Sequence, residues 1–347
     1  MSRVRVVFDG ESLITPDMVA ATVAAPATPQ ADEEFRAAEV QLALTMAITQ
    51  QRFEAGSSPA EVASFLVEEM RKMRASLDPG VWQKLLPIAQ AHPINRYLLQ
   101  DPFTRWSVEK PRGYSGDAQL LDFVYEHPSV ADAVAETTEL GRGIYSFTHN
   151  APTAAAARER LEILGRQVDT MAEERGGNLE VLTIASGHLR EGLKSTALKE
   201  GRLKRWVALD QDPISIGSIN RDFAGTAVEA IDGSVKGVLA GSYALGTFDL
   251  VYAAGLYDYL PRAVAIRLTR ACLKYLKPGG VFLFANYHRD LPDEGYMEAF
   301  MNWALVLRTE EEMWEIVNRS VDRNEADANV FYGENRAILY GTIARKD

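Results

Sequence analysis

The chain has 347 residues, of which 47% are hydrophobic and 24% charged, an ordinary composition for a soluble globular protein. Its formal net charge of −11 at pH 7 argues against non-specific nucleic-acid binding, because such binding requires a basic surface. The single cysteine, Cys272, excludes an intramolecular disulfide and a cysteine-rich zinc site. We see no apolar run of about 18 residues and no apolar signal-peptide core, so we expect a cytoplasmic protein without a membrane partner.

The first half of the chain is predicted to be almost entirely helical. Residues 3–8 alternate weakly and predict a strand, and the alanine- and proline-rich residues 24–30 predict a linker, so residues 1–30 form a leading segment. Residues 31–176 are predicted to form a helical domain. Its expected helices cover residues 32–55, 59–75, 79–91, 117–126, 129–141 and 153–175.

A different pattern begins after Gly176-Gly177-Asn178, which marks a domain boundary. Apolar runs and helical patterns alternate from there, as in an open α/β sheet with helices on both faces, and we assign residues 177–347 to this second domain. The expected strands cover residues 180–185, 205–209, 227–231, 248–253 and 280–286, with helices at 188–200, 213–223, 261–276 and 309–319. Two final strands, near 328–333 and 336–344, would form an antiparallel edge.

The most informative stretch is the turn after the first of these strands. Small residues at Ala185, Ser186 and Gly187 follow an apolar run, so the backbone N–H groups of the turn can approach a ligand. The next apolar run ends at Asp210, 23 residues after Gly187, followed by Gln211. An acidic residue at this spacing is the usual partner of ribose hydroxyls, because a carboxylate accepts two hydrogen bonds at once. The alternative for Asp210 is a helix N-cap.

Polar and aromatic residues also follow the later strands, where ligands of open α/β sheets bind. Asp232-Gly233-Ser234 comes after the third strand, and Asp232 is placed to accept from an adenine amino group; its alternative is a type I turn. Tyr252 and Gly255 end the fourth strand. His288 ends the fifth, and so also borders the predicted ligand site.

From the glycine turn, Asp210, Asp232-Gly233, Phe248-Asp-Leu-Val251 and Leu276-Lys-Pro-Gly-Gly280, residues 179–346 resemble the class I S-adenosylmethionine (SAM)-dependent methyltransferases. The resemblance implies an α/β fold, with a Rossmann-like class I methyltransferase sheet behind a mainly α-helical N-terminal domain. It implies SAM as cofactor, with the methionine end held by Ala185, Ser186 and Gly187, the ribose by Asp210 and Gln211, and the adenine by Asp232, Gly233 and Ser234. Tyr252 and Gly255 would complete the cofactor site.

The chain departs from the first motif of this family at three positions. Thr183 stands where the family often has an acid, and Ala185 and Leu189 stand at glycine positions. The methionine amino group is therefore expected to be held by another residue. A dinucleotide site is a weaker interpretation, because its three-glycine turn is represented here only by Gly187.

Two segments of the helical half are rich in glycine and polar residues: Lys110–Asp117 and Gly141–Asn150. Together with the helical front half they are similar to a bacterial subgroup of these enzymes, which includes fatty-acid methyl ester signal synthases. We interpret the helical half as a lid whose side chains face the SAM pocket. The cofactor-facing candidates are Arg112, Tyr114 and Arg158, and the catalytic candidates are Tyr145, Asn150 and His288. For Tyr114 and Tyr145 the alternative is core packing with a satisfied hydroxyl.

Methyl transfer from SAM requires mainly that the two reactants be positioned and desolvated. A carboxylate acceptor needs no general base, whereas a hydroxyl acceptor could use His288 or His149, and Tyr145 and Tyr252 could attract the sulfonium. We therefore predict a methyltransferase for a small molecule of secondary metabolism or signalling. One alternative is ring closure of SAM to azetidine-2-carboxylate and methylthioadenosine; another is a SAM-binding protein without catalysis. No spacing indicates a metal site, and a homodimer is left open.

Overall fold

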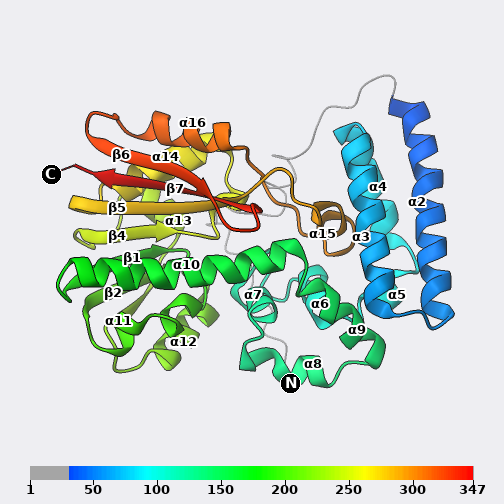
Figure 1. Cartoon of the computed structure of the whole chain (residues 1–347), viewed down its shortest axis with the longest axis horizontal. Helices are drawn as coiled ribbons and strands as arrows, with labels where there is room; N and C mark the ends of the chain where they lie inside the picture. Colours follow the sequence, from blue (N-terminus) through cyan, green and yellow to red (C-terminus); the bar gives the residue numbers. More distant parts are fainter. Residues whose placement is uncertain (1–30, 347) are drawn as a thin grey trace. The chain divides into compact units, whose positions relative to one another are not determined.

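A computed structural model describes residues 31–346, so the predicted strand at 3–8 and linker at 24–30 lie outside the described residues (Figure 1). The described chain forms two compact units. One contains residues 31–155 and Asp290–Leu305, and the other contains Ala156–Arg289 and residues 306–346. The division does not fall at residue 176, because most of the long helix α10 (Pro152–Glu174) belongs with the sheet. No helix among these residues is both long and apolar enough to span a membrane.

The first unit is built from helices. They are α2 (Ala31–Glu54), α3 (Pro59–Ser76), α4 (Pro79–Ala91), α5 (Asn95–Leu98), α6 (Pro102–Glu109), α7 (Ala118–Val124), η1 (Pro128–Val130), α8 (Ala131–Ala135), α9 (Glu139–Thr148) and α15 (Glu294–Phe300). Side chains that accept backbone N–H groups begin several of them, as Asp78 does for α4, Asp101 for α6 and Asp117 for α7. The predicted helical character of the N-terminal region is confirmed.

The prediction of one helix over 129–141 is wrong, because the chain breaks after α8 and restarts at Thr138. The Thr138 hydroxyl accepts the Gly141 N–H at 3.0 Å and so caps α9, which occupies most of the glycine-rich segment Gly141–Asn150. The two glycines of α9 allow close packing. A Cβ on Gly141 would lie 2.3 Å from the carbonyl oxygen of Gln100, and one on Gly143 would lie 2.8 Å from the ring of Pro59.

The second unit contains a seven-stranded sheet in the order β3-β2-β1-β4-β5-β7-β6 (Figure 1). Its strands are β1 (Leu179–Ile184), β2 (Leu203–Asp210), β3 (Val228–Asp232), β4 (Phe248–Ala253), β5 (Leu276–Tyr287), β6 (Ala326–Tyr332) and β7 (Ile338–Arg345). Strands β1 to β5 are parallel, and β7 pairs antiparallel with both β5 and β6. The predicted Rossmann-like sheet with an antiparallel edge is confirmed.

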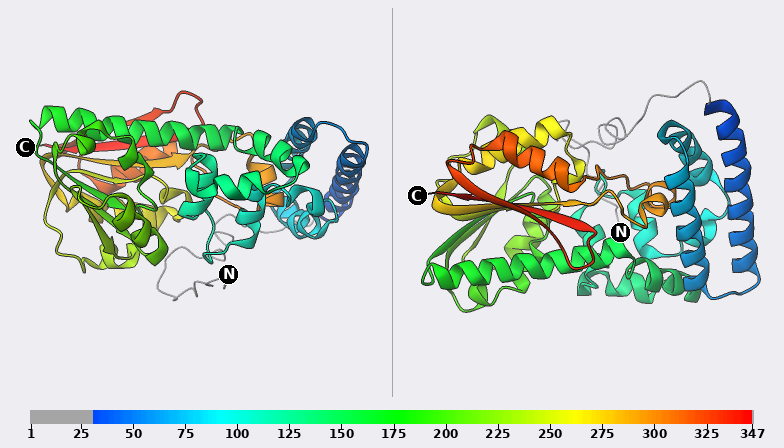
Figure 2. Two further views of the ribbon diagram at one scale, coloured as in Figure 1. Left: turned by 90° about the horizontal axis from the view of Figure 1, so that it is seen from below. Right: turned by 45° about the horizontal axis from the view of Figure 1, so that its top comes forward.

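Helices cover both faces of this sheet (Figure 2). They include η2 (Arg190–Leu193), α11 (Thr196–Lys199), α12 (Pro213–Asp222), α13 (Val235–Ala240), η3 (Tyr257–Tyr259), α14 (Arg262–Leu273) and α16 (Glu310–Ser320). On one face, α13, α14 and α16 bury an apolar core against strand residues such as Leu182, Val207 and Val251. Since strand side chains alternate, Thr183, Trp206 and Tyr252 point to the other face.

The predicted helix over 188–200 is wrong in its length. Leu189 has a φ of 52°, which a continuous helix does not tolerate, and only the short helices η2 and α11 follow. The Ser195 hydroxyl caps α11 by accepting the Leu198 N–H at 3.1 Å. The segment is therefore a turn followed by two short helices, and Glu191 lies in the first of them, two residues after Leu189.

Candidate functional site

The turn between β1 and η2 has the backbone of a three-glycine turn, although two of the three glycine positions hold residues with side chains. Ala185, Gly187 and Leu189 have φ values of 55°, 54° and 52°, the left-handed region that favours glycine. The Ser186 N–H donates to the Leu209 carbonyl at 3.1 Å, which fixes the turn against β2. The Ser186 hydroxyl is buried and has no hydrogen-bond partner among the described residues.

Asp210, at the end of β2, lies beside this turn as its spacing predicts. One carboxylate oxygen accepts the Gly187 N–H at 2.7 Å, and the other accepts the Asp212 N–H at 2.9 Å. Asp212, not Asp210, caps α12, since it accepts the Ile214 N–H at 2.9 Å. These two backbone bonds orient the Asp210 carboxylate, a group that accepts hydrogen bonds from hydroxyls. Gln211 is half-buried beside it.

The residues after β3 adjoin the same strand end. Asp232 pairs with Asp210 in the sheet register, and its side chain is exposed. The Gly233 N–H donates to the Asp210 carbonyl at 2.9 Å. The Ser234 hydroxyl accepts the Gly237 N–H at 3.1 Å and so caps α13, a helix absent from our prediction. The structure thus brings Ala185, Ser186, Gly187, Asp210, Asp232, Gly233 and Ser234 to one end of the sheet.

Tyr252 and Gly255 lie at the end of β4 in a buried polar cluster. The Tyr252 hydroxyl donates to the Glu191 carboxylate at 2.6 Å, and its ring is 1% exposed. Burial raises the pKa of Glu191, and it raises the pKa of Tyr252 well above its usual range. A Cβ on Gly255 would lie 3.7 Å from the guanidinium of Arg160, so this glycine borders the same cluster.

Arg160 and Asp258 were missed by the sequence reasoning, which named Arg158 instead. Arg160 donates to the Ala254 carbonyl at 3.0 Å, lies 3.7 Å from the Asp258 carboxylate and faces the Tyr287 ring at 5.6 Å. Burial raises the pKa of Asp258 to about 6 despite the nearby guanidinium. Both side chains are buried, whereas Arg158 is half-buried. Residues two apart in a helix point to different faces, and the buried stripe of α10, with Leu161, Leu164 and Val168, contains Arg160. The helical period was therefore a signal that could have favoured Arg160 over Arg158.

His288 follows β5 and is half-buried. Its ring meets Tyr332 edge-on, with ring centroids 5.4 Å apart, and its backbone N–H donates to the Ala337 carbonyl at 2.8 Å. It thus lies at the antiparallel edge of the sheet, beside β7. Its catalytic role stays a prediction.

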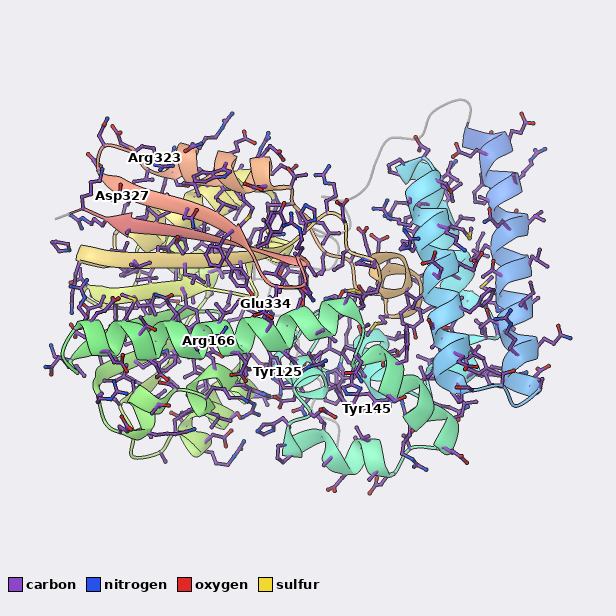
Figure 3. The ribbon with its side chains drawn as sticks, in the orientation of Figure 1. Tyr125, Tyr145, Arg166, Arg323, Asp327 and Glu334 are labelled. Atoms are coloured by element: carbon purple, nitrogen blue, oxygen red, sulfur yellow. The ribbon has the colours of Figure 1, made fainter. Side chains whose placement is uncertain are left out.

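The remaining predicted residues belong to the helical unit and are described there alone. Tyr145 lies on α9 (Figure 3). It is buried; its hydroxyl donates to the Phe123 carbonyl at 2.6 Å, and its ring stacks on His149 with ring centroids 4.8 Å apart. Arg112 is buried 3.9 Å from the Asp117 carboxylate. Tyr114 is half-buried, and Asn150 is exposed and donates to the Ser146 carbonyl at 3.0 Å. Their roles at a cofactor stay predictions.

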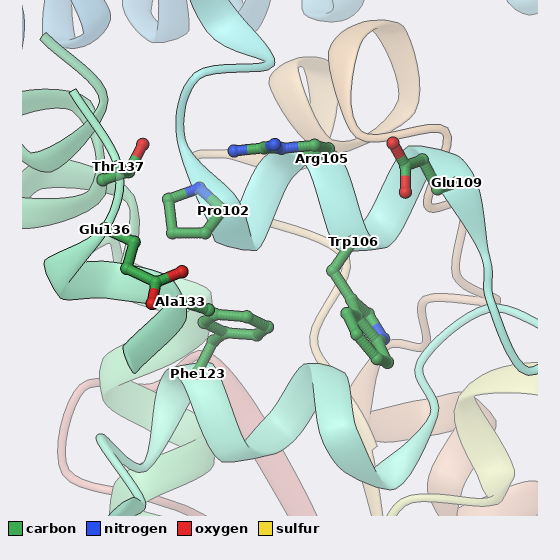
Figure 4. A pocket seen from close by; sticks show the side chains of 8 residues that line it. All are labelled: Pro102, Arg105, Trp106, Glu109, Phe123, Ala133, Glu136 and Thr137. Atoms are coloured by element: carbon green, nitrogen blue, oxygen red, sulfur yellow. The ribbon is translucent and has the colours of Figure 1, made fainter. Parts of the chain in front are cut away.

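The helical unit also holds a pocket of 330 Å³ of its own (Figure 4). Its walls are aromatic and its rim is charged; the lining residues are Pro102, Arg105, Trp106, Glu109, Phe123, Ala133, Glu136 and Thr137. The Trp106 indole N–H donates to the Asp117 carboxylate at 3.0 Å, which fixes the ring that forms one wall. The mixed charge of the rim does not select one class of ligand.

No protein-family model and no curated protein matches the chain. Among solved structures, a possible exported protein from Bordetella parapertussis is similar with a TM-score of 0.53 and 18% identity, over 93% of this chain and 100% of that one. Magnesium protoporphyrin IX methyltransferase from Synechocystis has a TM-score of 0.41 and 9% identity, over 57% of this chain and 85% of that one. The N-methyltransferase NodS from Bradyrhizobium japonicum has a TM-score of 0.35 and 15% identity, over 52% of this chain and 96% of that one. The likeness to these two enzymes is too slight to transfer an activity, whereas the likeness to the Bordetella protein shows a shared fold.

Proposed function

We propose that the protein is a SAM-dependent methyltransferase that acts on a small molecule. The observation that carries this proposal is the left-handed turn at Ala185, Gly187 and Leu189, joined to Asp210 by the 2.7 Å hydrogen bond from Gly187. The strand order places this turn at the carboxyl ends of β1 and β2, where open α/β sheets bind their ligands.

The residues present fit SAM. Asp210 would hold the ribose hydroxyls, and the exposed Asp232 would accept from the adenine amino group. The Ser186 hydroxyl is buried without a partner among the described residues, and a polar ligand at the turn would satisfy it. When bound, SAM would supply a methyl group on a sulfonium, whose sulfur leaves readily as the neutral thioether of S-adenosylhomocysteine.

The protein's own contribution is to orient the acceptor and to exclude water from it. The finer resemblance, to the fatty-acid methyl ester signal synthases, supports an apolar carboxylic acid as acceptor. A carboxylate attacks without a general base, so none is required of the chain. For a hydroxyl acceptor, His288 is the candidate that would take the proton.

We favour methyl transfer over the alternatives, because no contact among the described residues specifically supports ring closure of SAM or a loss of catalysis. The test is to incubate the full-length protein with SAM and a panel of small fatty acids and hydroxylated acids, and to analyse the products by mass spectrometry. S-adenosylhomocysteine and a methylated acid are expected together, and only when an acceptor is present. Methylthioadenosine formed from SAM alone, well above the rate without protein, would overturn the proposal.

A control variant checks that the products come from this site. Asp210→Asn is expected to lower product formation at least about tenfold, because it removes a charged acceptor from the turn. Asp327→Asn, an exposed change on β6, is expected to leave it unaltered (Figure 3). Equal loss in both variants would show that the activity does not depend on Asp210.

A further inference from the structure

The first motif lacks the acid that the family carries at the end of β1. Thr183 stands there, and its hydroxyl accepts the Trp206 indole N–H at 2.8 Å. Thr183 and Tyr252 are partners in the β1–β4 register, so they present neighbouring side chains to the same face of the sheet. Tyr252 donates in turn to Glu191 at 2.6 Å. The Glu191 carboxylate is therefore hydrogen-bonded to Tyr252, and Tyr252 is the β4 partner of Thr183, which stands at the position of the missing acid.

Glu191 is an unusual residue to bury. It follows the left-handed turn by two residues and is 9% exposed. A buried carboxylate is costly unless cations or hydrogen-bond donors offset its desolvation. Tyr252 supplies one donor, and the charges of Arg160 and Arg190 act on it. Arg190 is held by Asp222, which its guanidinium meets at 2.8 Å.

Arg160 supplies the opposite charge on the same side of the sheet. Its guanidinium is fixed against the Ala254 carbonyl at 3.0 Å, beside Gly255, where added bulk would lie 3.7 Å from it. Asp258, 3.7 Å away, holds it from one side. A buried carboxylate and a buried guanidinium thus lie near the ends of β1 and β4, which is the complement of a zwitterion.

We propose that Glu191 and Arg160 bind the amino-acid end of SAM, Glu191 the ammonium group and Arg160 the carboxylate. This inference rests on the proposed use of SAM and answers how the chain replaces the missing acid. Charged hydrogen bonds in a buried site are stronger than neutral ones, so each residue contributes to affinity for a ligand that carries its partner charge. The affinity for ligands without the amino-acid end should not depend on either residue.

Three ligands separate these contributions in calorimetric titrations of the full-length protein. SAM carries both the ammonium and the carboxylate of the amino-acid end. Decarboxylated SAM keeps only the ammonium of that end, and methylthioadenosine has neither group. Glu191→Gln should weaken the binding of SAM and of decarboxylated SAM at least about tenfold and leave the binding of methylthioadenosine unchanged. Arg160→Gln should weaken SAM by a similar factor and spare the other two ligands. Glu162→Gln, an exposed change on the same helix as Arg160, is the control and should alter none.

The outcomes distinguish the inference from the proposed function. If the wild-type protein binds none of the three ligands, the use of SAM itself is wrong. The inference is overturned if the wild-type protein binds SAM but Glu191→Gln weakens the binding of SAM and of methylthioadenosine equally. It is also overturned if Glu191→Gln weakens the binding of neither ligand. Binding of methylthioadenosine also reports that the variants are folded. Should Glu191→Gln fail to fold, Glu191→Asp keeps the charge, and the inference then requires it to bind SAM more tightly than Glu191→Ala binds it.

Discussion

Single residues at the turn carry the conformational cost of the site. Ala185 and Leu189 occupy backbone angles that cost an L-residue roughly 1–2 kcal/mol each. The buried Ser186 hydroxyl adds an unsatisfied polar group. Strain and unsatisfied groups of this kind cluster where a protein holds a ligand. Two substitutions at the turn test this account.

Ala185→Gly is expected to leave the free energy of unfolding unchanged or raise it by up to about 1 kcal/mol. Glycine relieves the left-handed strain, and this gain offsets the larger entropy of the unfolded chain. Chemical denaturation measures it. Ala37→Gly, an exposed change inside α2, is the control and should cost about 1 kcal/mol. A loss of equal size at Ala185 would contradict the positive φ that the structure assigns to it.

Ser186→Ala is expected to separate stability from binding. It removes a buried hydroxyl without a partner, so the protein without ligand should be as stable as the wild type or more stable by about 1 kcal/mol. Its affinity for SAM should fall, since a ligand would be the partner of that hydroxyl. Thermal unfolding with and without SAM gives both quantities. A destabilised variant with undiminished SAM affinity would show that the hydroxyl serves the fold alone.

At the scale of elements, helix starts and helix contacts are set by identifiable side chains. Asp101 caps α6 and is fully buried, accepting the N–H groups of Phe103 and Thr104 and the hydroxyls of Thr104 and Thr148. Burial raises the pKa of its carboxyl from 3.8 to about 6, although these hydrogen bonds act against the shift. At any pH between these two values the carboxyl is therefore protonated more often in the folded protein than in the unfolded chain.

Asp101→Asn is expected to reveal a pH dependence. A folded-state pKa above the unfolded value means that the stability contributed by this carboxyl is present below about pH 3.8 and lost as the pH rises through about 6. The asparagine does not titrate. The free energy of unfolding of the wild type minus that of the variant should therefore fall by up to about 3 kcal/mol from pH 4 to pH 7. A difference that is constant or rises with pH would contradict the shift.

Gly141→Ala and Gly217→Ala should have opposite effects, although both glycines lie in helices. A Cβ on Gly141 would meet the Gln100 carbonyl at 2.3 Å, so we expect a loss of about 1–3 kcal/mol. A Cβ on Gly217, in α12, meets nothing within 4 Å, and alanine there should stabilise the protein by up to about 1 kcal/mol. Denaturant unfolding of each compact unit, followed by separate probes, measures both. Equal effects would contradict the close packing of α9.

At the scale of the whole molecule, the parts readable from the sequence are those set by local pattern. The apolar runs at β1 to β5 and the spacing from Gly187 to Asp210 predicted the sheet and the turn, because each depends on neighbouring residues. The sequence did not reveal the Glu191–Tyr252 hydrogen bond or the burial of Arg160. The first joins residues 61 apart in the sequence and the second joins residues 94 apart. Contacts between such distant segments cannot be read from the pattern of a single sequence.

The same limit explains the misjudged helical segment. Gly141 and Gly143 lie inside α9, although glycine is unfavourable inside a helix. In the structure they permit α9 to approach Gln100 and Pro59, so tertiary packing decides against local propensity. The division into compact units is similarly non-local, because Asp290–Leu305 joins helices more than a hundred residues earlier in the chain.

The central claim is that the turn and Asp210 bind SAM, and a calorimetric titration of the full-length protein with SAM tests it most directly. We predict one SAM per chain for the wild type, and binding weakened at least about tenfold in Asp210→Asn, with Asp327→Asn unchanged. The absence of SAM binding in the wild type, or undiminished binding in Asp210→Asn, would contradict the account.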